Sequence, residues 1–149
     1  MSGFTPKDPD WENRLRRSFA AQAFMKHLGA HLTHIAPGAA DISLSLVPEV
    51  TQQHGFFHGG VTASIADSAA GYAGLSLFAP GNGILTTEFK LNLLNPARQD
   101  TLVARGRVVK PGRTLTIAKA DVFGVGGGGD EVHVATGLFT LMGVDGVTD

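Results

Sequence analysis

The sequence contains no cysteine among its 149 residues. This absence excludes disulfides, thiolate metal sites and a cysteine nucleophile, and it fits a reducing compartment. An excess of one charge is also lacking, because 12 basic residues balance 13 acidic ones. A chain without a basic excess has no electrostatic footprint for nucleic acid or an anionic membrane, although one small basic patch for an anionic ligand is compatible with it.

No long, purely apolar run is present either. The first 22 residues lack the apolar core of a signal peptide. The longest apolar stretch, Gly60 to Ala79, has the length of a membrane span but contains Asp67, several hydroxyl side chains and glycines. With 43% hydrophobic and 17% charged residues, the composition is that of a globular protein. We therefore expect one soluble, cytoplasmic domain.

Turn residues divide the chain into helices and strands. Asp8-Pro9-Asp10 predicts the start of a helix, with Asp8 as N-cap and Pro9 in the first helical position, and Gly29 predicts its end. Two alternating runs, "AHLTHIAPG" and "ADISLSLVP", predict a hairpin that turns at Pro37-Gly38. We expect an N-terminal helical segment over residues 1–30, followed by two paired strands.

A long helix of small residues is expected next, from about Gly59 to Ala79, and four strand-like runs follow it. They lie near residues 84–94, 101–110, 113–124 and 131–142. A helix with so many Gly, Ala and Ser positions must be approached closely by other backbone. One helix cradled by a curved antiparallel sheet of about six strands meets that need. This is an α+β architecture within a single domain, residues 1–149.

One carboxylate, Asp67, lies inside this small-residue helix. Burying an unpaired carboxylate is costly, so such a group is usually neutralised, paired or used in chemistry. A hydrogen bond to a core hydroxyl or to a partner chain is the purely structural interpretation. The chemical one involves Gly60, which lies on nearly the same face at the helix N-terminus, where an N–H stabilises a carbonyl that becomes an oxyanion.

The spacing of Gly60 and Asp67 predicts a dimer if both act on one carbonyl. Seven residues of helix separate them by about 10 Å along the axis, which is too far for a single carbonyl. An antiparallel partner helix would bring its own Asp67 to this Gly60. The residues small enough to permit so close a crossing are Ala63, Ser64, Gly71 and Gly74.

Neither the histidines nor the glycine cluster predicts a bound cofactor. His54 and His58 are four residues apart but lack the glutamate of HExxH, so we expect no metal site and expect His58 to anchor the loop or the helix start. The cluster from Gly124 to Gly129 formally contains GxGxxG. A strand and not a helix follows it, which predicts a hairpin loop and no dinucleotide site.

The stretch "KPGRT", Lys110 to Thr114, places two cations around a Pro-Gly turn between strands. An ordinary solvated hairpin and a clasp for phosphate groups both fit this pattern. In the first strand after the helix, Thr86 is either an exposed threonine or a hydroxyl that orients a water molecule. The residues of that strand expected to face the helix are Leu85, Thr87, Phe89, Leu91 and Leu93.

Taken together, these motifs resemble the hotdog-fold thioesterases, and most of all their phenylacetic-acid-degradation (PaaI-like) branch. The matching stretches include "QQHGFFHGGVTASIADSAAGYA", "FKLNLLNPA", "VVKPGRT" and "HVATGLFTLM", and the likeness extends over nearly everything after residue 23. An HGG–x6–D element on a small-residue helix, followed by a strand that ends in Asn-Pro, is a specific combination. The resemblance implies hydrolysis of acyl-CoA thioesters by homodimers with composite sites, often paired into tetramers, without a metal or redox cofactor.

The resemblance also implies roles for individual residues. Asp67 is the general base or the nucleophile, the Gly60 N–H polarises the thioester carbonyl, and His58 shapes the oxyanion site. Relatives often have Asn at the position of Gln52, and Thr86 matches a hydroxyl that assists the water. The expected contacts to substrate and coenzyme A are Gly59, Lys110, Gly112, Arg113 and Thr114.

Two other functions remain open from the sequence. The hotdog fold also contains hydratases and dehydratases, which need a histidine paired with an acid, and His58 and Asp67 are both present; the HGG–x6–D arrangement favours hydrolysis. A non-catalytic acyl-CoA-binding protein would use Arg113 without needing Asp67. The apolar residues that either line an acyl pocket or belong to the core are Phe56, Phe57, Tyr72, Leu75 and Phe78.

Overall fold

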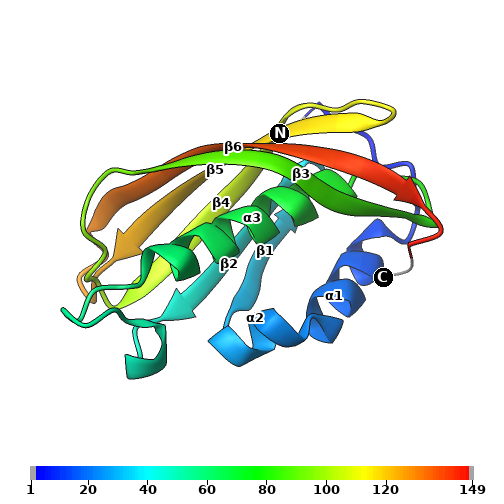
Figure 1. Ribbon diagram of the computed structural model, residues 1–149. Helices are drawn as coiled ribbons and strands as arrows, with labels where there is room; N and C mark the ends of the chain where they lie inside the picture. The colour runs from blue at the N-terminus through cyan, green and yellow to red at the C-terminus, as the bar shows by residue number, and fades with distance from the viewer. Residues whose placement is uncertain (1–2, 148–149) are drawn as a thin grey trace.

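The computed structural model describes residues 3–147, in which one curved antiparallel sheet wraps a central helix (Figure 1). The strands run in the order β1-β2-β4-β5-β6-β3, so β1 and β3 form the two edges. Their bounds are β1 His31–Ala36, β2 Ala39–Ser45, β3 Asn82–Leu93, β4 Thr101–Lys110, β5 Leu115–Val125 and β6 Glu131–Asp145. The predicted hotdog architecture of six strands and one long helix is confirmed.

The central helix α3, Gly59–Leu75, packs against the concave face of the sheet through its smallest residues. Ala66, Ala69 and Ala73 are completely buried. On the facing strand β4, a Cβ atom added to Gly106 would collide with the backbone of Ala69 and Ala70. The small residues therefore let helix and sheet backbones touch, as the sequence predicts.

The helix ends at Leu75, four residues earlier than expected. Beyond it the bonds shorten to i→i−3, from the Leu77 N–H to the Gly74 carbonyl and from the Phe78 N–H to the Leu75 carbonyl. Ser76 stabilises this end, since its hydroxyl donates to the Ala73 carbonyl and accepts from the Gly38 N–H, both at 2.7 Å. Within residues 3–147, no helix is both long and apolar enough to cross a membrane.

The N-terminal segment forms two helices, α1 Trp11–Ala21 and α2 Ala23–Leu28, where the sequence predicts one. Gln22 has extended backbone angles and separates them. The predicted N-cap is also wrong: Asp8 precedes the helix, and its carboxylate accepts from the Asp10 N–H at 2.8 Å in a turn. Gly29 does end the segment, in the left-handed conformation that favours glycine.

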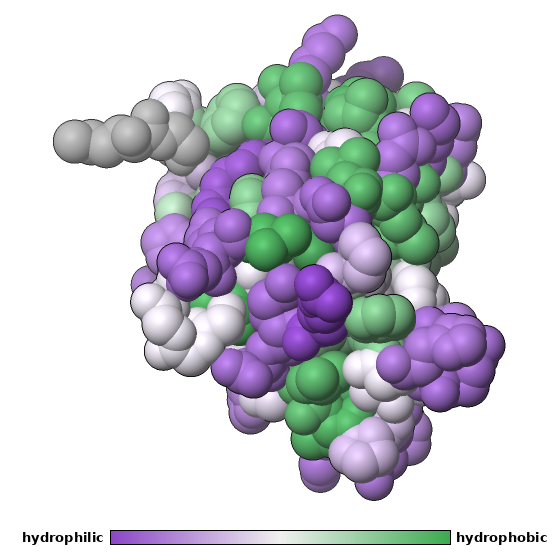
Figure 2. All heavy atoms as spheres, turned by 90° about the vertical axis from the view of Figure 1, so that its left-hand side faces the viewer, coloured by the Kyte–Doolittle hydropathy of each residue, from purple (hydrophilic) through white to green (hydrophobic). Residues whose placement is uncertain are grey.

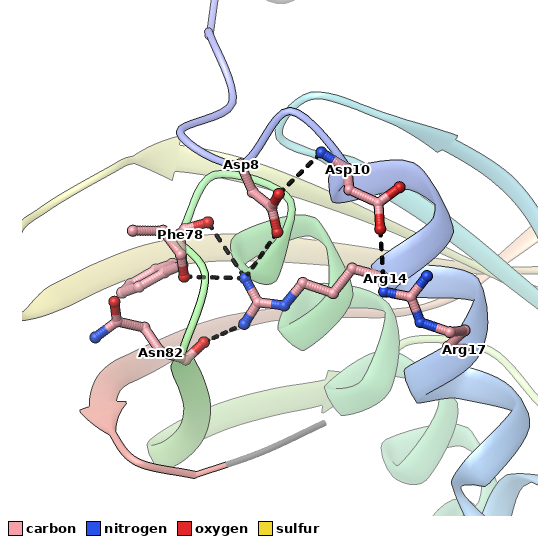
Figure 3. Close-up of polar contacts among 7 residues, drawn as sticks. Asp8, Asp10, Arg14, Arg17, Phe78 and Asn82 are labelled. Atoms are coloured by element: carbon pink, nitrogen blue, oxygen red, sulfur yellow. Dashed lines mark hydrogen bonds and ion pairs between the residues drawn. The ribbon is translucent and has the colours of Figure 1, made fainter.

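Arg14 fastens α1 to the segment that follows α3 (Figure 3). Its guanidinium is buried, with 7% of the residue exposed, and donates to the carbonyls of Phe78, Ala79 and Asn82. Asp8 provides the opposing charge at 3.6 Å. This network holds α1 against the segment that connects the end of α3 to the start of β3.

Strand β3 carries a bulge between Thr86 and Glu88, which alters the predicted facing of its side chains. Thr86 pairs with Leu141, a fully buried residue, so Thr86 faces the helix and Leu85 faces away with 50% exposure. Beyond the bulge the prediction holds, because Phe89, whose partner is the buried Phe139, lies on the helix side. The extra residue moves one polar side chain to the helix without reversing the rest of the strand.

The remaining turns follow the sequence closely. Pro37-Gly38 joins β1 to β2, Pro111-Gly112 joins β4 to β5, and the glycine cluster joins β5 to β6, each between antiparallel neighbours. The last three strands are shifted from the expected ranges by no more than three residues at either end.

Candidate active site

Asp67 and Thr86 meet in a pocket between α3, strand β3 and the N-terminal segment. The Thr86 hydroxyl donates to Oδ1 of Asp67 at 2.7 Å, so the β3 bulge delivers a hydrogen-bond donor to the helix carboxylate. The pocket has a volume of about 390 Å³ and reaches from this pair toward α1. Its lining residues are Ser18, Gln22, Asp67, Ser68, Gly71, Tyr72, Leu75, Ile84, Leu85 and Thr86.

The pKa of Asp67 is raised above its ordinary value of 3.8. Burial is the main cause, since it disfavours the charged form, and the hydrogen bond from Thr86 opposes it by stabilising the carboxylate. Among the residues from 3 to 147, no cation forms an ion pair with Asp67, and a half-buried carboxylate of this kind with a raised pKa is suited to accept a proton from water or to attack a carbonyl carbon.

The N-terminus of α3 is capped by His58. Its Nδ1 accepts a hydrogen bond from the Gly60 N–H at 2.8 Å, so the ring is the neutral tautomer with its proton on Nε2. His58 therefore anchors the helix start, as one of the sequence-based interpretations expects. Within residues 3–147, the N–H of Gly59 donates no hydrogen bond, so a donor remains at this helix end.

A second pocket of about 350 Å³ lies beside this helix end. Gln52 and Gly59 line it together with Phe56, Phe57, Thr62, Leu93, Leu94, Asn95, Pro96, Ala97 and Val134. The carboxamide oxygen of Gln52 accepts from the His54 N–H in its own loop. Figure 2 views this end of the molecule and shows apolar surface interrupted by polar groups.

The predicted catalytic residues, together with the predicted substrate contact Gly59, thus fall into two groups in a single chain. Asp67 and Thr86 line the first pocket, while Gln52 and Gly59 line the second, and the two pockets share no residue. Gly60 is about 10 Å from Asp67 along the helix axis. One chain alone does not bring the carboxylate and the helix N-terminus onto one carbonyl group.

Apart from Gly59, the predicted contacts to substrate and coenzyme A lie on the β4–β5 hairpin. The Thr114 carbonyl accepts from the Gly143 N–H at 2.8 Å, which ties this hairpin to the strand pair that carries Ile84. Neither the Asp67 pocket nor the second pocket is lined by Lys110, Gly112, Arg113 or Thr114.

Four residues that line the Asp67 pocket, Ser18, Gln22, Ser68 and Ile84, are not predicted from the sequence. Ser18 and Gln22 belong to the N-terminal segment, and nothing in "RSFAAQAF" signals a break at Gln22, because glutamine is a good helix former. Among the apolar candidates, Tyr72 and Leu75 line the Asp67 pocket. Phe78 is buried with 7% exposure and lines neither pocket.

Comparisons with known proteins agree with this architecture. Residues 54–129 match the model of the Thioesterase superfamily. A thioesterase family protein from Silicibacter pomeroyi has 42% identity, with 91% of this chain and 99% of that one covered at a TM-score of 0.89. The PaaI protein from the phenylacetic acid degradation operon of E. coli shares the fold at 21% identity, with 93% and 96% covered and a TM-score of 0.80. Since the matched residues form half of the chain and contain both α3 and β3, this chain belongs to the thioesterase superfamily, a family of thioester hydrolases.

Proposed function

We propose that the protein hydrolyses acyl-CoA thioesters with an aryl-acetyl or a short- to medium-chain acyl group, giving the free acid and coenzyme A. The observation that carries this proposal is Asp67, a half-buried carboxylate with a raised pKa and a hydroxyl at 2.7 Å, in a chain of the thioesterase superfamily. A structural ion pair would instead have a cation beside the carboxylate, and burial is the main influence on this one.

In the proposed reaction, Asp67 takes a proton from a water molecule that attacks the thioester carbonyl. The new C–O bond forms a tetrahedral oxyanion, the C–S bond then breaks, and the thiolate of coenzyme A receives a proton. Thr86 holds the Asp67 carboxylate in place through its hydrogen bond and orients the attacking water molecule. Direct attack by Asp67 through a mixed anhydride uses the same geometry. Single-turnover hydrolysis in ¹⁸O-water tests this second route, because water that opens the anhydride at the Asp67 carbon puts the label into the Asp67 carboxylate, whereas general-base catalysis puts it into the product acid.

The oxyanion is stabilised by the Gly60 N–H at the start of α3. The carbonyl oxygen replaces His58 Nδ1 as the acceptor of this N–H, and the Nε2–H of His58 and the N–H of Gly59 are further donors at the same helix end. Gln52, in the adjoining pocket, orients the loop that carries His58.

A homodimer completes the site in this proposal. The face of α3 turned away from the sheet has Ala63, Ser64 and Gly71 partly exposed, in line with Gly60 and Asp67. Gly74, by contrast, is buried against Leu141 and Ile84 of the sheet and takes no part in the crossing. An antiparallel partner helix on this face brings the carboxylate of one chain to the helix N-terminus of the other.

The free edge of the sheet supports the same arrangement. Strand β3 has an unpaired edge, and on its helix side Phe89 and Leu93 are 47% and 60% exposed. Exposed apolar edge strands pair readily with another chain. Dimers formed through β3 and α3 leave the β4–β5 hairpin, with Lys110 and Arg113, at the surface to bind the phosphates of coenzyme A. Light scattering tests the dimer and the expected pairing of dimers into tetramers.

Release of coenzyme A from a panel of acyl-CoAs, followed with a thiol reagent, tests the reaction. The protein adds no thiol background, because it contains no cysteine. Hydrolysis of at least one aryl-acetyl or short- to medium-chain thioester is expected, and folded protein that releases none would contradict the proposal.

Complementation tests the composite site. Asp67→Ala and Gly60→Val are each expected to be inactive, the second because even a Cβ atom at Gly60 lies 3.0 Å from His58 Nδ1. In a mixed dimer, one site has both defects and the other has neither, so random mixing restores about a quarter of the wild-type activity. If each chain held a complete site, mixing would restore nothing.

A further inference from the structure

Strand β3 carries two exposed charges of opposite sign on its unpaired edge. Glu88 and Lys90 flank Phe89 in the sequence, so their side chains lie on the opposite face of the sheet from Phe89, turned away from α3. Within residues 3–147, neither charge takes part in a salt bridge. An edge strand with two such charges can pair them with the same two charges of an antiparallel second copy.

Two contacts within one chain show how α3 lies along β3. At the start of the helix, a Cβ atom added to Gly59 would lie 3.1 Å from Cδ1 of Leu93. Further along the helix, Asp67 accepts the hydrogen bond from Thr86. The helix segment between these contacts therefore runs beside the strand segment 86–93, whose middle falls between residues 89 and 90.

The dimer proposed above places its two-fold axis midway between Gly60 and Asp67 of α3, because the axis exchanges these positions between the two chains. That point agrees to within one residue with the middle of the helix segment between the two contacts. The axis therefore crosses β3 near Phe89 and Lys90. When a strand pairs with its own antiparallel copy, directly opposite side chains share a face, so one residue lies on the axis and faces itself.

The two charges decide which residue lies on the axis. With Lys90 there, two ammonium groups would face each other, and like charges directly opposite destabilise strand pairing. With Phe89 there, Glu88 of each chain faces the partner's Lys90, and the dimer gains two pairs of opposite charge. Phe89, which is 47% exposed and stacked on Phe139, is then covered by its own copy.

We propose that a second copy of this chain pairs with β3 in one antiparallel register, with Phe89 on the two-fold axis and Glu88 of each chain opposite the partner's Lys90. This inference rests on the proposed function and defines the interface that its composite site needs. Leu93 and Leu85 are each four residues from Phe89, in opposite directions, so Leu93 of one chain lies beside the partner's Leu85. Because Leu93 lines the second pocket and Leu85 lines the Asp67 pocket, this register joins one pocket from each chain into a single site.

Cross-linking reads the register directly, because the chain contains no cysteine of its own. Phe89→Cys, Lys90→Cys and Leu91→Cys are oxidised with diamide and compared on a non-reducing gel. A residue on the axis lies about 5.5 Å or less from its own copy, Cα to Cα, whereas the copies of a residue one position away are about 8 Å apart, beyond the reach of a disulfide. Phe89→Cys is expected to give a covalent dimer, and the other two variants are not. A covalent dimer of Lys90→Cys or Leu91→Cys, or of none of the three, would overturn the inference.

Exchanging the charges tests the same register if Phe89→Cys does not fold. Homodimers of Glu88→Lys or of Lys90→Glu place like charges opposite each other twice, whereas a mixed dimer of these two variants places opposite charges there twice. After co-expression, the mixed dimer should therefore rise from the random half to about four-fifths or more of all dimers, which ion-exchange chromatography separates by charge. Glu49→Lys with Lys26→Glu, the same changes at exposed positions outside β3, should stay near the random half.

A random proportion of mixed dimer in the β3 pair would overturn the register. Neither measurement depends on catalysis, so the two proposals fail separately. Release of coenzyme A without the expected cross-link and mixed dimer would refute the register and leave the thioesterase activity intact. The expected cross-link and mixed dimer in a protein that hydrolyses no thioester would refute the proposed function and leave the interface intact.

Discussion

Replacing Asp67 by Asn tests the two effects of a carboxylate in α3, its effect on catalysis and its effect on the stability of the fold. Asparagine keeps the shape of the side chain, and its Oδ1 still accepts from Thr86, so the hydrogen bond at 2.7 Å is preserved. The charge and the basic oxygen are lost. We therefore expect kcat to fall by about 10²- to 10⁴-fold, as for loss of a general base, while the folded protein becomes more stable.

The sign of the stability change follows from the raised pKa. Because the folded carboxyl has a higher pKa than the unfolded one, the folded state holds the proton more tightly. Asp67 destabilises the folded state least when the pH is below 3.8, the ordinary pKa of the group, and this destabilisation grows as the pH rises through the folded pKa. The side chain is half-buried and water screens its charge, so removing the charge should raise the free energy of unfolding by up to about 1 kcal/mol at neutral pH. For a chain of this size that raises Tm by about 2–4 °C.

Thermal unfolding and release of coenzyme A, measured on the same preparations, check both parts. The stability gain should shrink as pH is lowered toward 3.8, where Asp67 becomes neutral in wild type as well. Asp130→Asn, in the exposed β5–β6 loop, is the matched control and should change neither quantity. A variant that keeps kcat within about threefold would refute the catalytic role. A lower Tm at neutral pH would refute the argument that burial destabilises the charge.

Two further substitutions probe the surroundings of the site. Thr86→Val removes the hydrogen bond that lowers the pKa of Asp67, so the acid limb of the pH–rate profile should move to higher pH and kcat should fall by about threefold to tenfold; Thr87→Val, at the exposed neighbour, should leave both unchanged. An acid limb that stays in place would contradict the assignment of that limb to the carboxylate. Arg14→Met leaves the buried Asp8 carboxylate without its opposing charge and three carbonyls without the guanidinium donor, so it should destabilise the fold by about 3–5 kcal/mol in denaturant unfolding. Arg16→Met removes only an exposed ion pair and should cost less than about 0.5 kcal/mol. Similar losses in the two arginine variants would show that the guanidinium network does not hold α1 in place.

The sequence predicts the layers of this fold because its signals are local and agree with one another. Alternating runs bounded by Pro-Gly and glycine turns give strands within a few residues of their positions. The small residues of α3 indicate a close backbone approach, and Gly106 supplies it. Asp67 is conspicuous because it is the one carboxylate in an apolar stretch.

The missed features depend on contacts between distant segments. The bulge after Thr86 is fixed by pairing with β6 and leaves no mark in the alternation of "ILTTEFKL". The break at Gln22 occurs in a run that favours helix throughout. Arg14 looks like a surface cation of an amphipathic helix until the chain after α3 folds back over it.

The strand order also dictates when the candidate site can form during synthesis. Asp67 and Thr86 are only 19 residues apart, but among residues 3–147 β3 pairs within the sheet only with β6, which is the last of these six strands to be synthesised. The nascent chain can therefore build α3 and the β1-β2-β4-β5 part of the sheet while β3 has no strand to join. Such a non-local pairing is slow to form and leaves β3 exposed to other chains in the meantime. The polar contact of the Asp67 pocket is thus among the last contacts of this sheet and helix to become ordered.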